Sequence, residues 1–313
     1  MKKICLWSFS LLLVATLFGC GGGGGGGGSG GLTTTIFTDW SSVDPPENVG
    51  LSGLSQDTEY ELDANPDTPP FTVTLNPVDT ATATIRYRAN GTIERIDVVT
   101  PYNNLTWNEA AGDIFGEDGP LVFAGDQDVI KFGVFFNPLE MPPADAWEYQ
   151  TFGAWADARP IAAGAVGALS VGTPTPDDVL IPLVNTAEFT GYSAGIYTTS
   201  DGTTAYVTES DVIVDVDFLA RELAFRTTGT TLTNIETGDP WTDGPPPTLD
   251  ISSGPPLRYD LGVNRFTGDV TAAGLTGLTG QTTGQFYGPA AEELGGVFSL
   301  TGSDGLEHYS GAY

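Results

Sequence analysis

Cysteine, histidine and basic side chains are scarce in this 313-residue sequence, and each shortage excludes a kind of chemistry. The cysteines are Cys5 and Cys20, and the single histidine is His308. One imidazole cannot by itself build a histidine metal site. The sequence has only 11 basic residues but 40 acidic ones, which gives a net charge of −29 at pH 7. We therefore expect no binding of nucleic acid, or of an anionic membrane surface, through a basic patch.

The N-terminus is the one place with a long apolar run, and its pattern predicts export. Two lysines precede the 15 residues Ile4–Phe18, and a glycine then stands directly before Cys20. Such a run is too short for a permanent transmembrane helix, which needs about 20 residues, but it fits a cleaved signal. We predict that residues 1–19 are a lipoprotein signal peptide and that Cys20 is lipidated. An ordinary secretory signal with Cys20 nearby is the alternative, because Phe18 is bulky for this cleavage site.

Removal of residues 1–19 would leave Cys20 as the only cysteine. If it carries lipid, the folded part has no thiol, and so neither a disulfide nor cysteine-based catalysis or metal binding. Residues 20–31 would be the lipidated cysteine and a Gly-rich tether, whose root-mean-square span is about 18 Å. No later segment is long and apolar enough for a transmembrane helix, so the lipid is the expected membrane anchor.

The mature chain would carry 9 basic residues against 40 acidic ones, a net charge of −31. We interpret this excess as a solvated surface that keeps the protein soluble, and a basic partner or cationic ligand is the alternative. Acidic pairs such as Asp177-Asp178 and Glu292-Glu293 lack the spacing and the central glycine of a calcium loop. We predict no bound metal and no cofactor.

The folded part is patterned for β-strands. Helical periodicity over about 12 residues or more is absent, and runs rich in Thr, Val, Ile and aromatic residues are separated by turn signals. In the first half these runs are Phe71–Leu75, Ala83–Tyr87 and Ile93–Val99, and Asn90-Gly91 is a hairpin signal. A Pro-rich break at 173–182 predicts a boundary between a β-rich region, residues 32–182, and a second unit, residues 183–313.

The second unit contains the clearest alternation in the sequence. One face of a strand carries Val212, Val214, Val216 and Phe218, and the other carries Asp211, Asp215 and Asp217. Such a strand has one buried and one wet face. About eight strands with no helices to cover their edges predict a closed barrel, because closure removes exposed edges.

One segment of this unit resembles a known family signature. The run Gly284–Phe298, GQFYGPAAEELGGVF, is similar to the pattern G-x-F-Y-G-P-x-A-x-E-x-G-G-x-F of transferrin-binding protein B-like bacterial surface lipoproteins, which include factor H-binding proteins. The similarity is strong over residues 183–313 and weak before about residue 147. It implies an all-β fold in which a C-terminal eight-stranded antiparallel β-barrel packs on an N-terminal β-rich handle-like region. It implies no particular ligand, since family members bind different partners through loops and handle surfaces.

Within this run, Gly288–Gly296 links two strands. Pro289 suits the first position of a helical turn, and Gly295 suits a left-handed exit. We predict a single helical turn, with Leu294 packed inward, that serves stability and not ligand binding.

Gly191–Gly195 matches the GxSxG pattern of a nucleophile elbow, so a serine hydrolase using Ser193 is a remote alternative. The elbow needs a strand, a sharp turn and a helix, but this pentapeptide lies among β-type residues. We interpret its glycines as easing strand curvature in a small barrel and predict no catalytic residues. On alternation, His308 is expected to be an exposed strand residue opposite Tyr309.

Four aromatic residues, Trp147, Tyr149, Phe152 and Trp155, gather shortly before the predicted boundary. We interpret them first as core between the two units. A ligand-binding patch that uses Trp147, Tyr149 and Trp155 is the alternative.

Together these patterns favour a non-enzymatic binding protein, lipid-anchored at the outer membrane and facing the cell exterior. Its partner would be an unknown protein or small-molecule ligand. A structural or immune-evasion surface protein without a small-molecule ligand is the second interpretation, and display on the periplasmic face is the alternative location.

Overall fold

The computed structural model describes residues 34–62, 71–126, 131–141, 147–159, 163–177, 181, 185–199, 204–241, 248–272, 277–303 and 307–313. The predicted signal peptide, Cys20 and the Gly-rich tether lie outside the described residues, as does part of the Pro-rich break. Within the described ranges, no helix is long and apolar enough to span a membrane.

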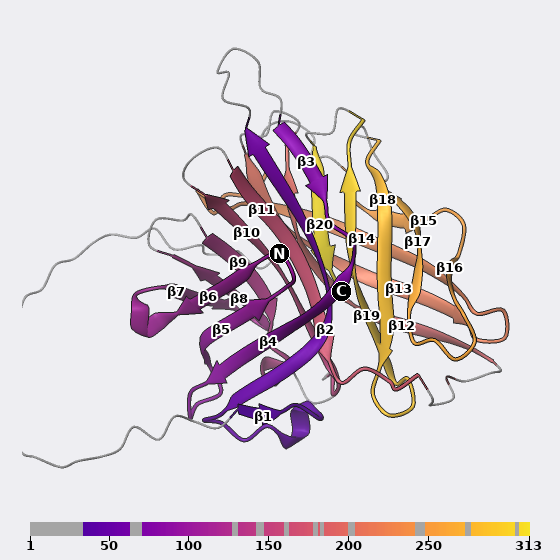
Figure 1. Ribbon diagram of the computed structural model, residues 1–313, viewed down its shortest axis with the longest axis horizontal. Helices are drawn as coiled ribbons and strands as arrows, with labels where there is room; N and C mark the ends of the chain where they lie inside the picture. The colour runs from indigo at the N-terminus through magenta and orange to yellow at the C-terminus, as the bar shows by residue number, and fades with distance from the viewer. Residues whose placement is uncertain are drawn as a thin grey trace, which may run out of the picture.

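The N-terminal half forms one 11-stranded sheet, here called the handle sheet (Figure 1). Its strands are β1 (Thr34–Ile36), β2 (Asn48–Leu62), β3 (Phe71–Leu75), β4 (Asp79–Tyr87), β5 (Ile93–Val99), β6 (Asn104–Asn108), β7 (Ile114–Asp118), β8 (Leu121–Gly125), β9 (Lys131–Phe136), β10 (Gln150–Arg159) and β11 (Ala163–Gly172). Its short 3₁₀ turns are η1 (Trp40–Ser42), η2 (Glu109–Ala111) and η3 (Pro138–Glu140). The strand order is β6-β5-β4-β2-β11-β10-β9-β8-β7, with β1 and β3 also paired to β2. The sheet curls into a nearly closed barrel whose two edge strands, β6 and β7, are joined through η2.

The C-terminal half forms a closed antiparallel barrel. Its strands are β12 (Thr186–Thr198), β13 (Ala205–Asp217), β14 (Glu222–Asn234), β15 (Ile251–Ser253), β16 (Leu257–Tyr259), β17 (Phe266–Ala272), β18 (Thr279–Tyr287), β19 (Glu293–Thr301) and β20 (His308–Ala312). The short strands β15 and β16 share one position between β14 and β17, and β12 closes the ring by pairing with both β13 and β20. The nine labelled strands therefore occupy eight positions. The predicted all-β fold with an eight-stranded C-terminal barrel is confirmed.

The alternation in β13 explains how this barrel acquires its core. Val212, Val214 and Val216 are at most 4% exposed and belong to the cluster that fills the barrel interior. Asp211, Asp215 and Asp217 are exposed on the other face. Large aromatic side chains complete the filling of the interior: Phe225, Phe266, Phe286, Phe298 and Tyr309. The barrel is thus a packed core and not a channel.

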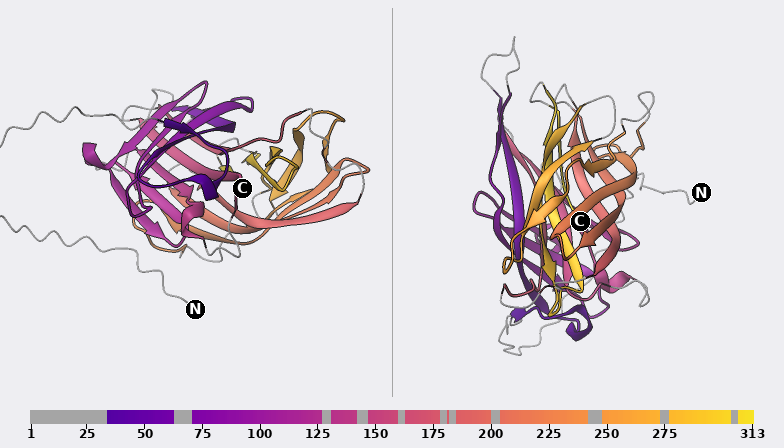
Figure 2. Two further views of the ribbon diagram at one scale, coloured as in Figure 1. Left: turned by 90° about the horizontal axis from the view of Figure 1, so that it is seen from below. Right: turned by 90° about the vertical axis from the view of Figure 1, so that its right-hand side faces the viewer.

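A third apolar cluster lies between the two halves, which stand side by side in Figure 2. From the handle sheet it takes residues of β9, β10 and β11, including Phe136, Phe152 and Val166. From the barrel it takes residues of β12, β13, β19 and β20, including Ile196 and Val297. Where these residues meet, the outer face of each sheet is buried, because the other sheet covers it.

The connection between β18 and β19 differs from the predicted helical turn. These strands stay paired up to the turn, so that five residues close the hairpin. Left-handed backbone occurs at Gly288 (φ 85°) and Ala291 (φ 62°), whereas Gly295 already lies inside β19. The prediction was wrong because a short hairpin needs its left-handed residues within the turn and leaves no length for a helix exit. The inward packing of Leu294 is confirmed, since it is 7% exposed in the barrel core.

His308 is buried, with 4% exposure, and not the predicted exposed residue. Tyr309 points into the barrel core, so alternation places His308 on the outer face of β20. That face packs against β10 and β11 of the handle sheet. The alternation was sound, but the sequence does not reveal that this outer face is covered.

Candidate binding site at the junction of the two sheets

A set of buried polar contacts, here called the clasp, joins the start of β19 to the segment that precedes β10. The carboxylate of Glu293 accepts hydrogen bonds from the backbone N–H groups of Glu148 (2.5 Å) and Tyr149 (3.1 Å). The amide of Gln150 donates to the carbonyl of Leu294 at 3.2 Å. Burial raises the pKa of Glu293, while the two N–H donors oppose that shift.

A second part of the clasp joins β18 to β11. The Tyr287 hydroxyl donates to the Ser170 carbonyl at 2.7 Å and lies 2.9 Å from the Ser170 hydroxyl. Gly295 faces this contact, and a Cβ at that position would lie 2.2 Å from Gln150 Oε1 and 2.7 Å from Ser170 Oγ. The family-like run 284–298 therefore positions the barrel against the handle sheet, and Gly295 is required by close approach and not by backbone conformation.

Beside the clasp lies a cavity of about 310 Å³, here called the junction groove. Its wall includes Trp147, Glu188, Tyr192, Glu292, Glu293 and Tyr313. It opens beside the first half of β12, which has no strand on the β20 side, because β20 pairs with β12 only over Ala194–Thr198. The first half of β12, including Tyr192 at 46% exposure, is consequently left partly open.

The aromatic side of the junction groove is held rigidly. Trp147 stacks on Phe136 with ring centroids 4.6 Å apart and an interplanar angle of 24°. Tyr192 lies 6.0 Å from the same Phe136 ring, and Phe152 lies 5.2 Å from it on the buried side. Aromatic rings that are both fixed and partly exposed are typical of protein interfaces. The groove thus combines rigid aromatic surface with three glutamates, and its described lining contains no basic residue.

The predicted candidate residues separate in the structure. Trp147 lines the junction groove, and Tyr149 lies beside it at the clasp, with its ring against Gly288. Trp155 is different: it is 0% exposed in the core of the handle sheet and offers no surface to a ligand. This part of the hypothesis was wrong because successive side chains of β10 alternate between its two faces. Trp155 points into the core enclosed by the handle sheet, while Phe152 packs toward the barrel.

Sequence reasoning missed the barrel side of the groove. Glu188 and Tyr192 come from β12, about 40 residues beyond Trp147 in the chain. Nothing in their local pattern marks them, since both occupy exposed positions of an alternating strand. Only the pairing of β12 with β20 shows that this stretch has a free edge.

The GxSxG segment does not form a nucleophile elbow. Ser193 lies in the middle of β12, 3% exposed, and its hydroxyl has no hydrogen-bond partner among the described residues. Burial lowers the pKa of His308 to about 4, and its Nε2 lies 2.8 Å from the Ser310 hydroxyl. His308 pairs with Thr198, five residues along β12 from Ser193, so the serine and the imidazole are not neighbours. No cluster of three or more potential metal ligands occurs in the described part of the chain.

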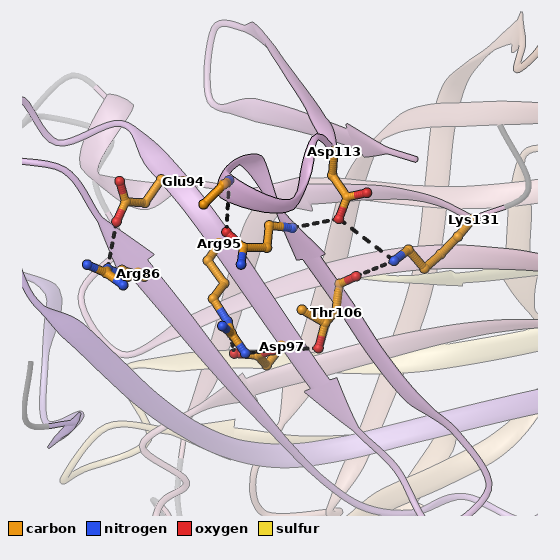
Figure 3. A network of polar contacts seen from close by, with 9 residues as sticks. Arg86, Glu94, Arg95, Asp97, Thr106, Asp113 and Lys131 are labelled. Atoms are coloured by element: carbon orange, nitrogen blue, oxygen red, sulfur yellow. Dashed lines mark hydrogen bonds and ion pairs between the residues drawn. The ribbon is translucent and has the colours of Figure 1, made fainter. Parts of the chain in front are cut away.

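On the β4–β6 side of the handle sheet, basic side chains form ion pairs with acidic ones (Figure 3). Arg86 pairs with Glu94 at 2.6 Å, and Arg95 pairs with Asp97 at 2.8 Å. The Lys131 ammonium donates to the Thr106 carbonyl and lies 3.9 Å from Asp113. The lysine thereby connects β9 with β6, near the open edge of the sheet.

Comparison with known proteins identifies the class of the C-terminal half. Residues 181–313 match the family model described as the C-lobe and N-lobe β-barrels of Tf-binding protein B. This part of the chain is a transferrin-binding protein B-like barrel domain, as the sequence resemblance predicted. The comparison with curated proteins found no match.

Solved structures give weaker likenesses. The haemoglobin receptor HpuA from Kingella denitrificans is 14% identical with a TM-score of 0.40, covering 90% of this chain and 93% of that one. Transferrin binding protein B from serogroup B Neisseria meningitidis is 12% identical with a TM-score of 0.34, covering 86% and 75%. A mutant of the Haemophilus parasuis protein is 12% identical with a TM-score of 0.34, covering 85% and 76%. At these scores the likenesses carry no argument about ligand or mechanism.

Proposed function

We propose that this chain is a non-enzymatic binding protein that captures a macromolecular ligand. The observation that carries the proposal is the family match of residues 181–313, because that family is described by its binding of transferrin. The match does not mean that transferrin is the ligand of this chain. Fold and function separate readily, and recognition depends on the particular site.

The junction groove is the part of the surface best suited to this role. It offers the exposed ring of Tyr192, the stacked Trp147 and the carboxylate of Glu188 within one cavity. Most of the barrel interior is filled by its own aromatic side chains, so we propose that the ligand binds at the junction groove, whose inner wall includes the core residues Val212, Val214 and Tyr313. A protein ligand could use a basic side chain here, because carboxylates and aromatic faces both attract cations.

We further propose that Cys20 anchors the protein by lipid to the outer membrane, with the folded part facing the cell exterior. The order of basic, apolar and small residues before Cys20 supports the anchor, and the glycine run supports display away from the headgroups. The boundary between the handle-like region and the barrel is proposed at residues 182/183.

Three experiments test these proposals. The immobilised wild-type chain should recover a specific protein from extracts of the host or environment. An excess of soluble chain should compete for that protein and prevent its recovery. Recovery of none would contradict protein capture.

Metabolic labelling with a fatty-acid analogue should mark the wild-type chain but not Cys20→Ser, and an unlabelled wild-type chain would contradict the anchor. Protease shaving of intact cells separates exterior from periplasmic display.

A further inference from the structure

A second cavity, of about 420 Å³, lies on the other side of the clasp and is chemically opposite to the junction groove. It is here called the donor cavity. The handle sheet contributes Ser52, Leu54, Thr82 and Val99, and the barrel contributes Arg265 and Gln285. Its described lining contains no carboxylate, although the chain carries 40 acidic residues.

Strand register places the two barrel side chains together. Phe266 pairs with Gly284 in the antiparallel β17–β18 ladder, and the Asn264 side chain bonds the backbone of Phe286, so the same register continued by one residue places Arg265 opposite Gln285. Directly opposed residues share a face, with their Cβ atoms about 5 Å apart. The guanidinium and the amide can therefore address the same ligand group.

Both side chains have unused donors. Gln285 is only 7% exposed and lies beside the Tyr287 hydroxyl, and its buried Nε2 forms no hydrogen bond of ordinary geometry among the described residues. A buried donor without an acceptor is unfavourable, and a ligand oxygen would satisfy it. Arg265 is exposed and forms no ion pair within the described chain, whereas Arg226 and Arg258 on the same barrel pair with carboxylates at 2.6 and 2.5 Å.

The handle side of the donor cavity has a different chemistry. Ser52, Thr82 and Val99 form one row across β2, β4 and β5, because Ser52 pairs with Thr82 and Thr82 pairs with Val99. Leu54 lies two residues along β2 on the same face. This wall presents hydroxyl groups next to small apolar surfaces, a combination that suits the hydroxyls and the C–H face of a sugar ring.

One acidic residue lies behind this wall. Asp57 is 1% exposed inside the handle sheet and accepts hydrogen bonds from Thr100 and from the Asn103 amide. Its partner Thr100 also lines the donor cavity, and burial raises the pKa of Asp57, which favours the uncharged form of this carboxyl group. The net field of the chain disfavours anions, so an anion here needs the direct contact with Arg265.

We propose that the donor cavity binds the carboxylate of a sugar acid, with Arg265 and Gln285 on the carboxylate and the Ser52–Thr82–Val99 row against the ring. A guanidinium matches a carboxylate in two parallel hydrogen bonds, and Gln285 Nε2 supplies a third donor. This site is independent of the proposed protein capture, which uses the other side of the clasp.

The experiment titrates the full chain with glucuronate by calorimetry. Glucose supplies the ring without the carboxylate, acetate supplies the carboxylate without the ring, and inorganic phosphate tests for a general anion site. We expect saturable binding of glucuronate, at least about 10-fold tighter than binding of each of the three other probes.

Arg265→Gln should weaken glucuronate binding at least about 10-fold, because it removes the charge-assisted contacts. The matched control is Arg258→Gln, which removes one exposed arginine from the same barrel and should leave the affinity within about 2-fold. Thermal melts establish that both variants fold. Absence of saturable glucuronate binding, equal binding by Arg265→Gln, or tighter binding of acetate or phosphate would each overturn the proposal. None of these results bears on capture of a protein through Trp147 and Tyr192.

Discussion

The two halves of the molecule use the same kind of strand but close their sheets in different ways. The barrel closes through backbone pairing, since every strand position has neighbours on both sides, although β12 meets β20 only over Ala194–Thr198. The handle sheet stops at β6 and β7, and side chains span its open edge. The Lys131 ammonium reaches the Thr106 carbonyl, and Lys131 also lies 5.5 Å above the Trp107 ring. The comparison teaches that the barrel has a self-sufficient ladder, whereas the handle sheet depends on side-chain contacts and on its neighbour.

Removal of the handle sheet should have the largest effect and tests this contrast directly. The fragment 183–313 contains all strands of the barrel, so we expect β-type circular dichroism and a cooperative melt. Because Ile196, Val207 and Val297 lose their apolar cover, the melting temperature should fall by about 10 °C or more. A fragment with no cooperative transition would mean that the barrel ladder is not self-sufficient, or that the proposed boundary is wrong.

Gly295→Val should be the most damaging single substitution at the contact between the halves. The added side chain would meet Gln150, Ser170 and the backbone carbonyl of Tyr313, each within 2.7 Å of the new Cβ. We expect a loss of about 3 kcal/mol in the free energy of unfolding, the upper part of the range for overpacking. Urea melts measure it.

The control for that measurement is Gly116→Val on the edge strand β7. A Cβ there has no neighbour within 4 Å, so the change should stay within about 0.5 kcal/mol. Equal effects at Gly295 and Gly116 would contradict the clasp as the reason for the glycine.

The buried imidazole of His308 should make the covered interface sensitive to acid. Its pKa is about 4 in the folded chain, below the ordinary value of 6.5. The unfolded chain therefore binds the proton first, and stability is lost as pH falls from 6.5 towards 4. Between pH 7 and pH 5 this difference corresponds to about 2 kcal/mol.

Melts of wild type and His308→Gln across this range isolate the effect from the carboxyl groups, whose contributions are common to both. The wild-type chain should lose more stability on acidification than the variant. Because the chain has one histidine, proton NMR of the imidazole assigns the titration without ambiguity. A histidine that titrates near 6.5 in the intact chain would contradict the cover by the handle sheet.

Ser193→Ala should have the smallest effect. The hydroxyl is buried without a partner among the described residues, so its removal leaves no orphaned group behind. We expect a change in unfolding free energy within about 1 kcal/mol, neutral or stabilising, and unchanged ligand capture. Loss of a hydrolytic activity on a generic ester in this variant would revive the serine hydrolase alternative.

The barrel could be predicted largely from sequence because its strands alternate and its turns are local. The runs Phe71–Leu75 and Ile93–Val99 likewise match β3 and β5. Contacts between distant strands could not be predicted from the sequence. The burial of His308, the clasp at Gly295 and the contact of Trp147 with Tyr192 all depend on how the outer faces of the two sheets pack together. Alternation assigns a residue to a face, but it does not say whether that face meets water or another sheet.

The central claim is that a ligand is recognised at the junction groove, where the two halves meet. The most direct test is the affinity of the captured ligand for the double variant Trp147→Ala/Tyr192→Ala, with Tyr102→Ala as the control. Tyr102 lies in the connection between β5 and β6, is 39% exposed and does not line the groove. We predict that the double variant binds at least about 10-fold more weakly, while Tyr102→Ala binds as the wild type does. Wild-type affinity in a folded double variant would contradict the claim.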